Sequence, residues 1–147
     1  MPYTPETVEQ FFQTYARHSD SGDIPALVAC FAHTFLTAGP QGAQLTCASD
    51  FALALPKRKQ LFDAIGCQSS TLVSVRQVPL DERYLLARTR WRLTFSRPRP
   101  LDIDVDSDFL IDTGGDQFKI LLYLANQDIM AVLRDHGITL PTPSPSS

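Results

Sequence analysis

The sequence predicts an α+β fold in which helices gather on one face of an antiparallel sheet. The first observation is a pair of charge ladders, in which alternate residues are Arg88, Arg90 and Arg92 and then Asp102, Asp104, Asp106 and Asp108. Alternation at period two is typical of a β-strand whose two faces differ. The second observation is that helical patterns lie before and after the strand patterns, which is the segregated order of an α+β domain.

The two ladders predict one antiparallel hairpin. Prolines within residues 97–100 cannot continue a ladder, so this segment is expected to form the loop. The expected cross-strand pairs are Arg92 with Asp104, Arg90 with Asp106 and Arg88 with Asp108. Slipping the register by one residue would expose the apolar face, so the charges also fix the register. Trp91 and Phe109 therefore lie on the inward face.

The N-terminal region predicts two helices and a short strand. Thr4 is a capping residue, Pro5 suits the first turn, and an apolar stripe follows at helical spacing, formed by Val8, Phe11, Phe12 and Tyr15. This helix ends near residues 19–22. Asp23 then caps a second, short helix over residues 24–31. Residues 34–37 are expected to form a strand that ends at residues 39–40.

The middle of the chain predicts a third helical region. Residues 49–50 can cap it, but the residue before a proline is disfavoured in helical geometry. We therefore expect a short turn of helix up to Leu55 and a better helix from Pro56 to Ile65, closed by Gly66. The cations at positions 57–59 would lie mainly in the solvated first turn of that helix.

The remainder predicts four long strands and a closing helix. The strands are expected over residues 72–78, 84–95, 102–112 and 118–125, and the helix from Asn126 through His136. Residues 141–147 consist of proline, serine and threonine, which predicts a disordered tail. Residues 1–140 then form a single domain, as a chain of 147 residues suggests.

Composition and charge exclude several classes of function. A net charge of −3 argues against a nucleic-acid partner, which usually faces a basic surface. The sequence contains no run of about 18 apolar residues, so we expect no membrane span. The N-terminus lacks the pattern of a signal peptide. Three cysteines without a close pair suit a reducing compartment, so we expect a cytoplasmic protein.

The order of elements resembles the nuclear transport factor 2-like superfamily, which includes ketosteroid isomerases and polyketide cyclases. The resemblance is carried by the opening helix that ends in residues 19–23, the short helix over residues 24–31, the strand that ends at residues 39–40, and the long strands centred on Trp91 and Leu122. It implies a strongly curved sheet wrapped around the N-terminal helices, a cone or cystatin-like roll with an apolar cavity. Isomerase-like members carry a proton-abstracting aspartate just before the proline at the end of the first strand. In this chain that position holds Gly39. Tyr15 could match the tyrosine that stabilises the enolate oxygen in those isomerases.

The candidate site residues follow from this arrangement. Tyr15 is a candidate acid or oxyanion donor and His33 a candidate base, and the candidate ligand-binding residues are Phe12, Tyr15, Trp91 and Phe109. The alternatives are that Tyr15, Trp91 and Phe109 fill the core and that His33 lies at the surface. Scattered histidines and cysteines predict no metal site, and no cofactor motif is present.

Three functions are compatible with these residues. The first is binding of a small apolar or aromatic molecule in the cone cavity. The second is a cofactor-independent dehydratase, cyclase or isomerase that uses acid–base catalysis. The third is an interaction scaffold with a filled cavity. The resemblance also implies a homodimer that forms through the sheet, whose mixed charges can complement a second copy.

Overall fold

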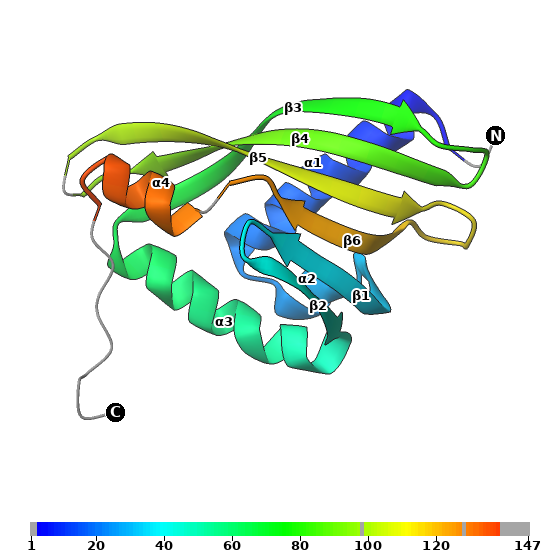
Figure 1. The fold of residues 1–147 in the computed structure, drawn as a ribbon, viewed down its shortest axis with the longest axis horizontal. Helices are drawn as coiled ribbons and strands as arrows, with labels where there is room; N and C mark the ends of the chain where they lie inside the picture. The colour runs from blue at the N-terminus through cyan, green and yellow to red at the C-terminus, as the bar shows by residue number, and fades with distance from the viewer. Residues whose placement is uncertain (1–2, 98, 128, 139–147) are drawn as a thin grey trace.

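The computed structural model describes residues 3–97, 99–127 and 129–138, with four helices and six strands (Figure 1). The helices are α1 (Pro5–Ser21), α2 (Ile24–Val28), α3 (Ala48–Ala64) and α4 (Ile129–Asp135). The strands are β1 (Phe31–Gly39), β2 (Gly42–Cys47), β3 (Cys67–Pro79), β4 (Tyr84–Phe95), β5 (Leu101–Asp112) and β6 (Lys119–Ala125). The expected tail, residues 141–147, lies outside the described residues. Within the described part of the chain, no helix is long and apolar enough to cross a membrane.

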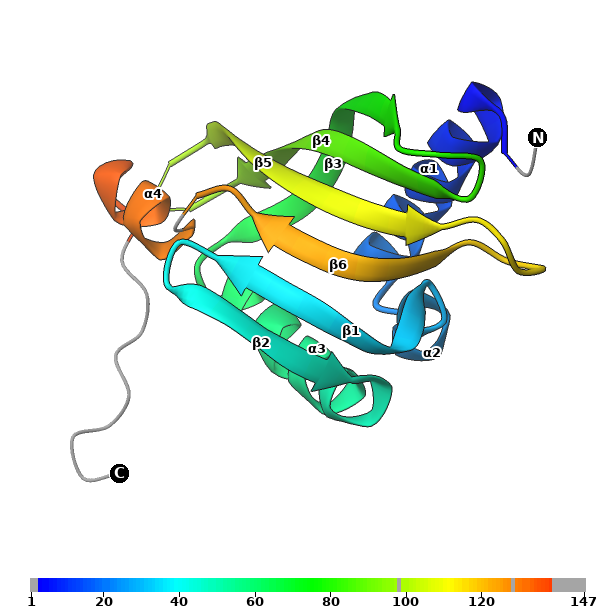
Figure 2. The ribbon, with the colours of Figure 1, turned by 45° about the vertical axis from the view of Figure 1, so that its right-hand side comes forward.

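All six strands form one sheet in the order β2-β1-β6-β5-β4-β3. The pairs are antiparallel except β1 and β6, which run parallel. Helices α1 and α3 lie on the same face of this sheet, and α4 lies at one end (Figure 2). The α+β class predicted from the sequence is confirmed. The parallel pair places the first strand of the chain, β1, beside the last, β6, and leaves β2 at the edge of the sheet.

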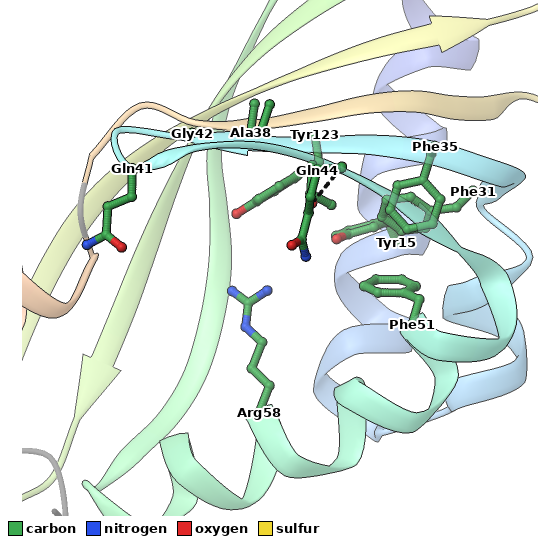
Figure 3. A pocket seen from close by; sticks show the side chains of 12 residues that line it. Tyr15, Phe31, Phe35, Ala38, Gln41, Gly42, Gln44, Phe51, Arg58 and Tyr123 are labelled. Atoms are coloured by element: carbon green, nitrogen blue, oxygen red, sulfur yellow. Dashed lines mark hydrogen bonds between the residues drawn. The ribbon is translucent and has the colours of Figure 1, made fainter.

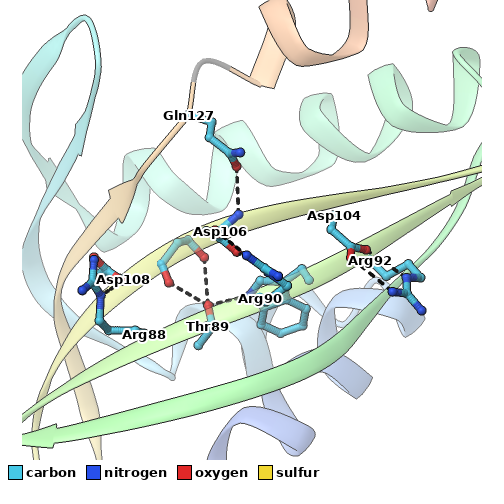
Figure 4. A network of polar contacts seen from close by, with 10 residues as sticks. Arg88, Thr89, Arg90, Arg92, Asp104, Asp106, Asp108 and Gln127 are labelled. Atoms are coloured by element: carbon cyan, nitrogen blue, oxygen red, sulfur yellow. Dashed lines mark hydrogen bonds and ion pairs between the residues drawn. The ribbon is translucent and has the colours of Figure 1, made fainter. Parts of the chain in front are cut away.

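The predicted charge ladder is confirmed. Each arginine of β4 lies directly opposite the expected aspartate of β5 (Figure 4). The shortest distance from Nε to Oδ1 is 3.3 Å for Arg88–Asp108, 2.8 Å for Arg90–Asp106 and 2.9 Å for Arg92–Asp104. The inward face carries Trp91 and Phe109, both buried. Asp108 is the exception to a fully solvated ladder, because its side chain is only 7% exposed.

The predicted caps position α1 and α2. Thr4 accepts a hydrogen bond from the Thr7 amide (3.2 Å), and Thr7 Oγ1 accepts one from the Thr4 amide (2.8 Å). Gly22 adopts the left-handed conformation (φ 71°) that commonly ends a helix. Asp23 then accepts a hydrogen bond from the Ala26 amide (3.2 Å) and starts α2. These local interactions fix the turn that connects α1 to the first strand.

The structure differs from the expectation in two places after Asp23. The short helix stops at Val28, and Phe31 already begins β1, because the residues from 31 onward pair with β6 and β2. The strand β2 was not expected. It forms a hairpin with β1 through residues 40–41, but its first four residues are all exposed. An edge strand without alternating burial carries no hydrophobic period that a sequence pattern could detect.

The expected interruption before Pro56 is also wrong, since α3 is one continuous helix. Proline removes one helical hydrogen bond and crowds the preceding turn. Phe51 and Leu55 before the proline and Phe62 after it nevertheless pack against the body of the protein. Packing on both sides of Pro56 therefore holds the two parts of α3 in line.

The core consists of two clusters of buried side chains. The first joins α1 to the sheet around Phe12, Trp91 and Phe109. The second closes the far end of the sheet and includes Phe95 of β4 and Leu133 of α4. The candidate site described below adjoins the first cluster, on the side where α3 covers β1 and β2.

Candidate functional site

A cavity of about 450 Å³ opens between α1, α3 and the strands β1, β2 and β6 (Figure 3). Its walls combine aromatic rings with a few polar groups. The lining residues are Tyr15, Phe31, Phe35, Thr37, Ala38, Gln41, Gly42, Ala43, Gln44, Phe51, Arg58 and Tyr123. The size falls within the range of roughly 300–1,000 Å³ that is usual for small-molecule sites.

The sheet contributes one row of side chains to this cavity. Tyr123 of β6 lies opposite Thr37 of β1, which lies opposite Gln44 of β2. Directly opposite residues share a face of the sheet, so these three side chains all point toward the helices. The same row continues to Phe109 of β5, which contacts Tyr123 with 5.1 Å between ring centroids. The parallel pairing of β1 with β6 therefore builds this wall of the cavity.

Helix α1 places Tyr15 at the inner end. Its ring lies 5.7 Å from Phe109, 5.8 Å from Trp91 and 6.1 Å from Phe31, measured between centroids. Phe12, one turn earlier on α1, lies 6.4 Å from Tyr15. Of the four expected ligand-binding residues, only Tyr15 is part of the cavity wall. The other three are buried behind it and hold its ring in place.

Helix α3 supplies the opposite wall through Phe51 and Arg58. Seven residues make about two helical turns, so both side chains fall on the same face of the helix. Phe51 contacts Phe31 and Phe35, with ring centroids 4.6 and 5.1 Å apart. Arg58 lies over the ring of Phe62, with Cζ 5.4 Å from the centroid, and its guanidinium extends into the cavity (Figure 3). No described carboxylate lies within ion-pair distance of Arg58.

His33, the other candidate catalytic residue, does not reach this cavity. It is exposed, and it is not one of the lining residues. The pairing of β1 with β6 is irregular between Phe31 and Leu36, which includes the position of His33. The alternation of faces along β1 is therefore broken there. The structure does not bring Tyr15 and His33 together as an acid–base pair.

The surroundings of Tyr15 keep its hydroxyl neutral. Burial raises the pKa of Tyr15 well above its ordinary value, and the neighbouring Tyr123 adds to this shift. The positive charge of Arg58 acts in the opposite direction but is a smaller influence. The Tyr15 hydroxyl is thus a hydrogen-bond donor rather than a base at physiological pH.

The described lining holds no aspartate, glutamate, histidine or cysteine. No group of three such residues that could hold a metal ion occurs within residues 3–97, 99–127 and 129–138. Burial raises the pKa of the thiols of Cys30 and Cys67, which keeps both protonated. Among the described residues, the cavity lining therefore offers hydrogen-bond donors and one cation, but no carboxylate, imidazole or thiolate.

Sequence reasoning missed most of the residues that form this cavity. Arg58 appeared to belong to a solvated turn, and Gln44 lies on the unexpected strand. Tyr123 carried a usable signal, because a tyrosine within an apolar strand has a hydroxyl that needs a polar environment. The signal for Phe51 and Arg58 was their spacing of seven residues, which the expected interruption at Pro56 concealed.

No protein-family model matches the chain, and no curated protein matches it in sequence. Solved structures do match. An NTF2-like protein with a cystatin-like fold from Novosphingobium aromaticivorans is 15% identical, with 88% of this chain and 86% of that chain covered and a TM-score of 0.68. An NTF2-like protein of unknown function from Shewanella oneidensis MR-1 is 11% identical, covering 83% and 98%, with a TM-score of 0.68. A candidate polyketide cyclase from Xanthomonas campestris pv. campestris is 15% identical, covering 86% and 93%, with a TM-score of 0.56.

These identities are low, so the similarities establish the fold and nothing finer. They confirm the nuclear transport factor 2-like, cystatin-like architecture that the order of elements suggested.

Proposed function

We propose that this protein, a chain with the nuclear transport factor 2-like fold, binds a small apolar or aromatic molecule in the cavity between α1, α3 and the β1–β2 end of the sheet. One observation carries the proposal. An open cavity of about 450 Å³ has aromatic walls with a few polar groups at their edge, which is the usual composition of a small-molecule site.

The two alternative functions have less support. Acid–base catalysis needs a base within hydrogen-bond reach of the substrate, and the described lining contains no carboxylate or imidazole. A scaffold with a filled cone would leave no open cavity. Homodimerisation through the outer face of the sheet is compatible with ligand binding, and sedimentation of the purified protein would test it.

The proposal can be tested with N-phenyl-1-naphthylamine, a neutral dye whose fluorescence rises in apolar surroundings. Gln44→Trp should fill the cavity, because Gln44 points inward from an exposed edge strand. Leu45→Trp is the matched control, since Leu45 is 72% exposed and its side chain alternates to the other face of β2. We expect saturable binding to the wild type and to Leu45→Trp, and weakened binding to Gln44→Trp.

The outcome that contradicts the proposal is equally defined. Absence of saturable binding to the wild-type protein, or equal binding to the two tryptophan variants, would exclude the cavity as the binding site. Circular dichroism of each variant establishes that the comparison is made between folded proteins.

A further inference from the structure

The geometry points to a ligand that carries a carboxylate, which Arg58 binds while the aromatic walls enclose an apolar ring system. This inference rests on the proposed function and narrows it to aromatic or apolar organic acids. It follows from three features of the cavity: a cation with no ion-pair partner among the described residues, converging hydrogen-bond donors, and the distance between the polar and aromatic ends.

The first feature is the lack of an aspartate partner for Arg58 among the described residues. Four arginines on or beside the β4–β5 ribbon, Arg83, Arg88, Arg90 and Arg92, each pair with an aspartate. Arg58 has no such partner within the part of the chain that the structure describes, and its guanidinium lies over the Phe62 ring. This cation–π contact leaves the guanidinium N–H groups available to a ligand.

The second feature is that other donors face the same space. The ends of Tyr15, Tyr123 and Gln44 extend into the cavity beside the Arg58 guanidinium (Figure 3). The Tyr15 hydroxyl is neutral at physiological pH, as an ordinary tyrosine is, and can donate a hydrogen bond to an anion. A negatively charged acceptor can form an ion pair with Arg58 and accept hydrogen bonds from the other donors at the same time. A neutral ligand cannot form the ion pair. The planar fork of a guanidinium matches the two oxygens of a carboxylate.

The third feature is the spacing of the two ends along α3. Phe51 lies at the aromatic end, against Phe31 and Phe35. Arg58 follows seven residues later, which corresponds to about 10 Å along the helix axis. A ligand that reaches both therefore has an apolar body with its carboxylate at one end. A bicyclic aromatic acid has these proportions.

A matched pair of probes tests this inference directly. Titration calorimetry with 2-naphthoate and with 2-naphthamide compares one ring system with and without the negative charge. We expect wild-type protein to bind 2-naphthoate about tenfold more tightly, the lower part of the range for charged hydrogen bonds, because Arg58 is exposed to solvent. Added salt should weaken binding of the naphthoate but not of the amide.

Variants assign the effect to Arg58. In Arg58→Gln the tenfold preference should disappear, so that the two probes bind with equal affinity, and Arg58→Lys should retain part of the preference. Lys57→Gln is the control, since it removes a neighbouring positive charge from a residue that does not line the cavity. If Lys57→Gln lowers the preference as much as Arg58→Gln does, the preference reflects the overall positive charge near the cavity, and the inference is overturned.

The outcomes for the inference and for the proposed function are distinct. If both probes bind the wild type with equal affinity, the proposed function stands and the carboxylate inference is wrong. If neither probe binds, both fail together. If the preference for 2-naphthoate persists in Arg58→Gln, the anion is recognised elsewhere and the role assigned to Arg58 is wrong.

Discussion

Replacing Arg88 with alanine should destabilise the fold more than the same change at Arg90 or Arg92. The three arginine side chains are similarly exposed, at 53%, 53% and 46%. Their partners differ, because Asp108 is 7% exposed while Asp106 and Asp104 are 38% and 36% exposed. Removing Arg88 leaves a buried carboxylate without its counter-charge.

The magnitude follows from these exposures. Breaking a buried ion pair typically costs about 3–5 kcal/mol, and breaking an exposed one about 0.2–1 kcal/mol. Arg88 is itself half-exposed, so water can partly replace it, and we expect a loss of about 2 kcal/mol for Arg88→Ala. Arg90→Ala should lose less than about 1 kcal/mol, although its hydrogen bond to Asp106 is shorter.

Urea unfolding followed by circular dichroism measures the free energy of unfolding for each variant. The reasoning is refuted if Arg88→Ala and Arg90→Ala lose the same amount. That result would mean that water reaches Asp108 as soon as Arg88 is shortened, so that the burial of the aspartate has no energetic consequence. Arg88→Lys serves as a control that keeps the charge but loses the guanidinium geometry.

Two further predictions concern polar groups in the site or behind it. Because the pKa of Tyr15 is raised, the folded protein keeps a proton that the unfolded chain releases near pH ~10, so stability falls as pH rises above that value. At about pH 10 Tyr15 should therefore contribute no tyrosinate, so the folded wild type and Tyr15→Phe should have the same tyrosinate absorbance. A lower tyrosinate absorbance in Tyr15→Phe would contradict the enclosure of Tyr15. Thr89→Val should cost about 1–3 kcal/mol, because Thr89 Oγ1 accepts a hydrogen bond from the buried Trp91 indole (2.8 Å). A change in unfolding free energy below about 0.5 kcal/mol would contradict that role.

The parts of the fold that could be predicted depend on local or nearest-neighbour physics. Thr4 and Asp23 cap helices through residues three positions away. The ladder of β4 and β5 pairs residues across a single loop, and its register follows from charge and from the burial of Trp91. Each of these interactions involves residue types whose preference is strong enough to act without help from the rest of the chain.

The continuity of α3 is the clearest case in which tertiary structure overrides a local preference. A proline inside a helix costs about 3 kcal/mol in isolation. Leu55 directly before it is buried, and Phe62 after it packs in the second cluster of the core. These contacts with residues distant in sequence outweigh the local cost, and only because of them do Phe51 and Arg58 share one face.

By itself the sequence determined the α+β class, the caps of α1 and α2, the paired charges on the sheet and the inward position of Trp91. Only the tertiary structure decided where the cavity lies. The parallel pairing of β1 with β6 brings Gln44 and Tyr123 to one wall, and α3 carries Arg58 to the other. A site assembled from separate strands and helices has no short-range pattern, because its residues become neighbours only when the chain has closed around them.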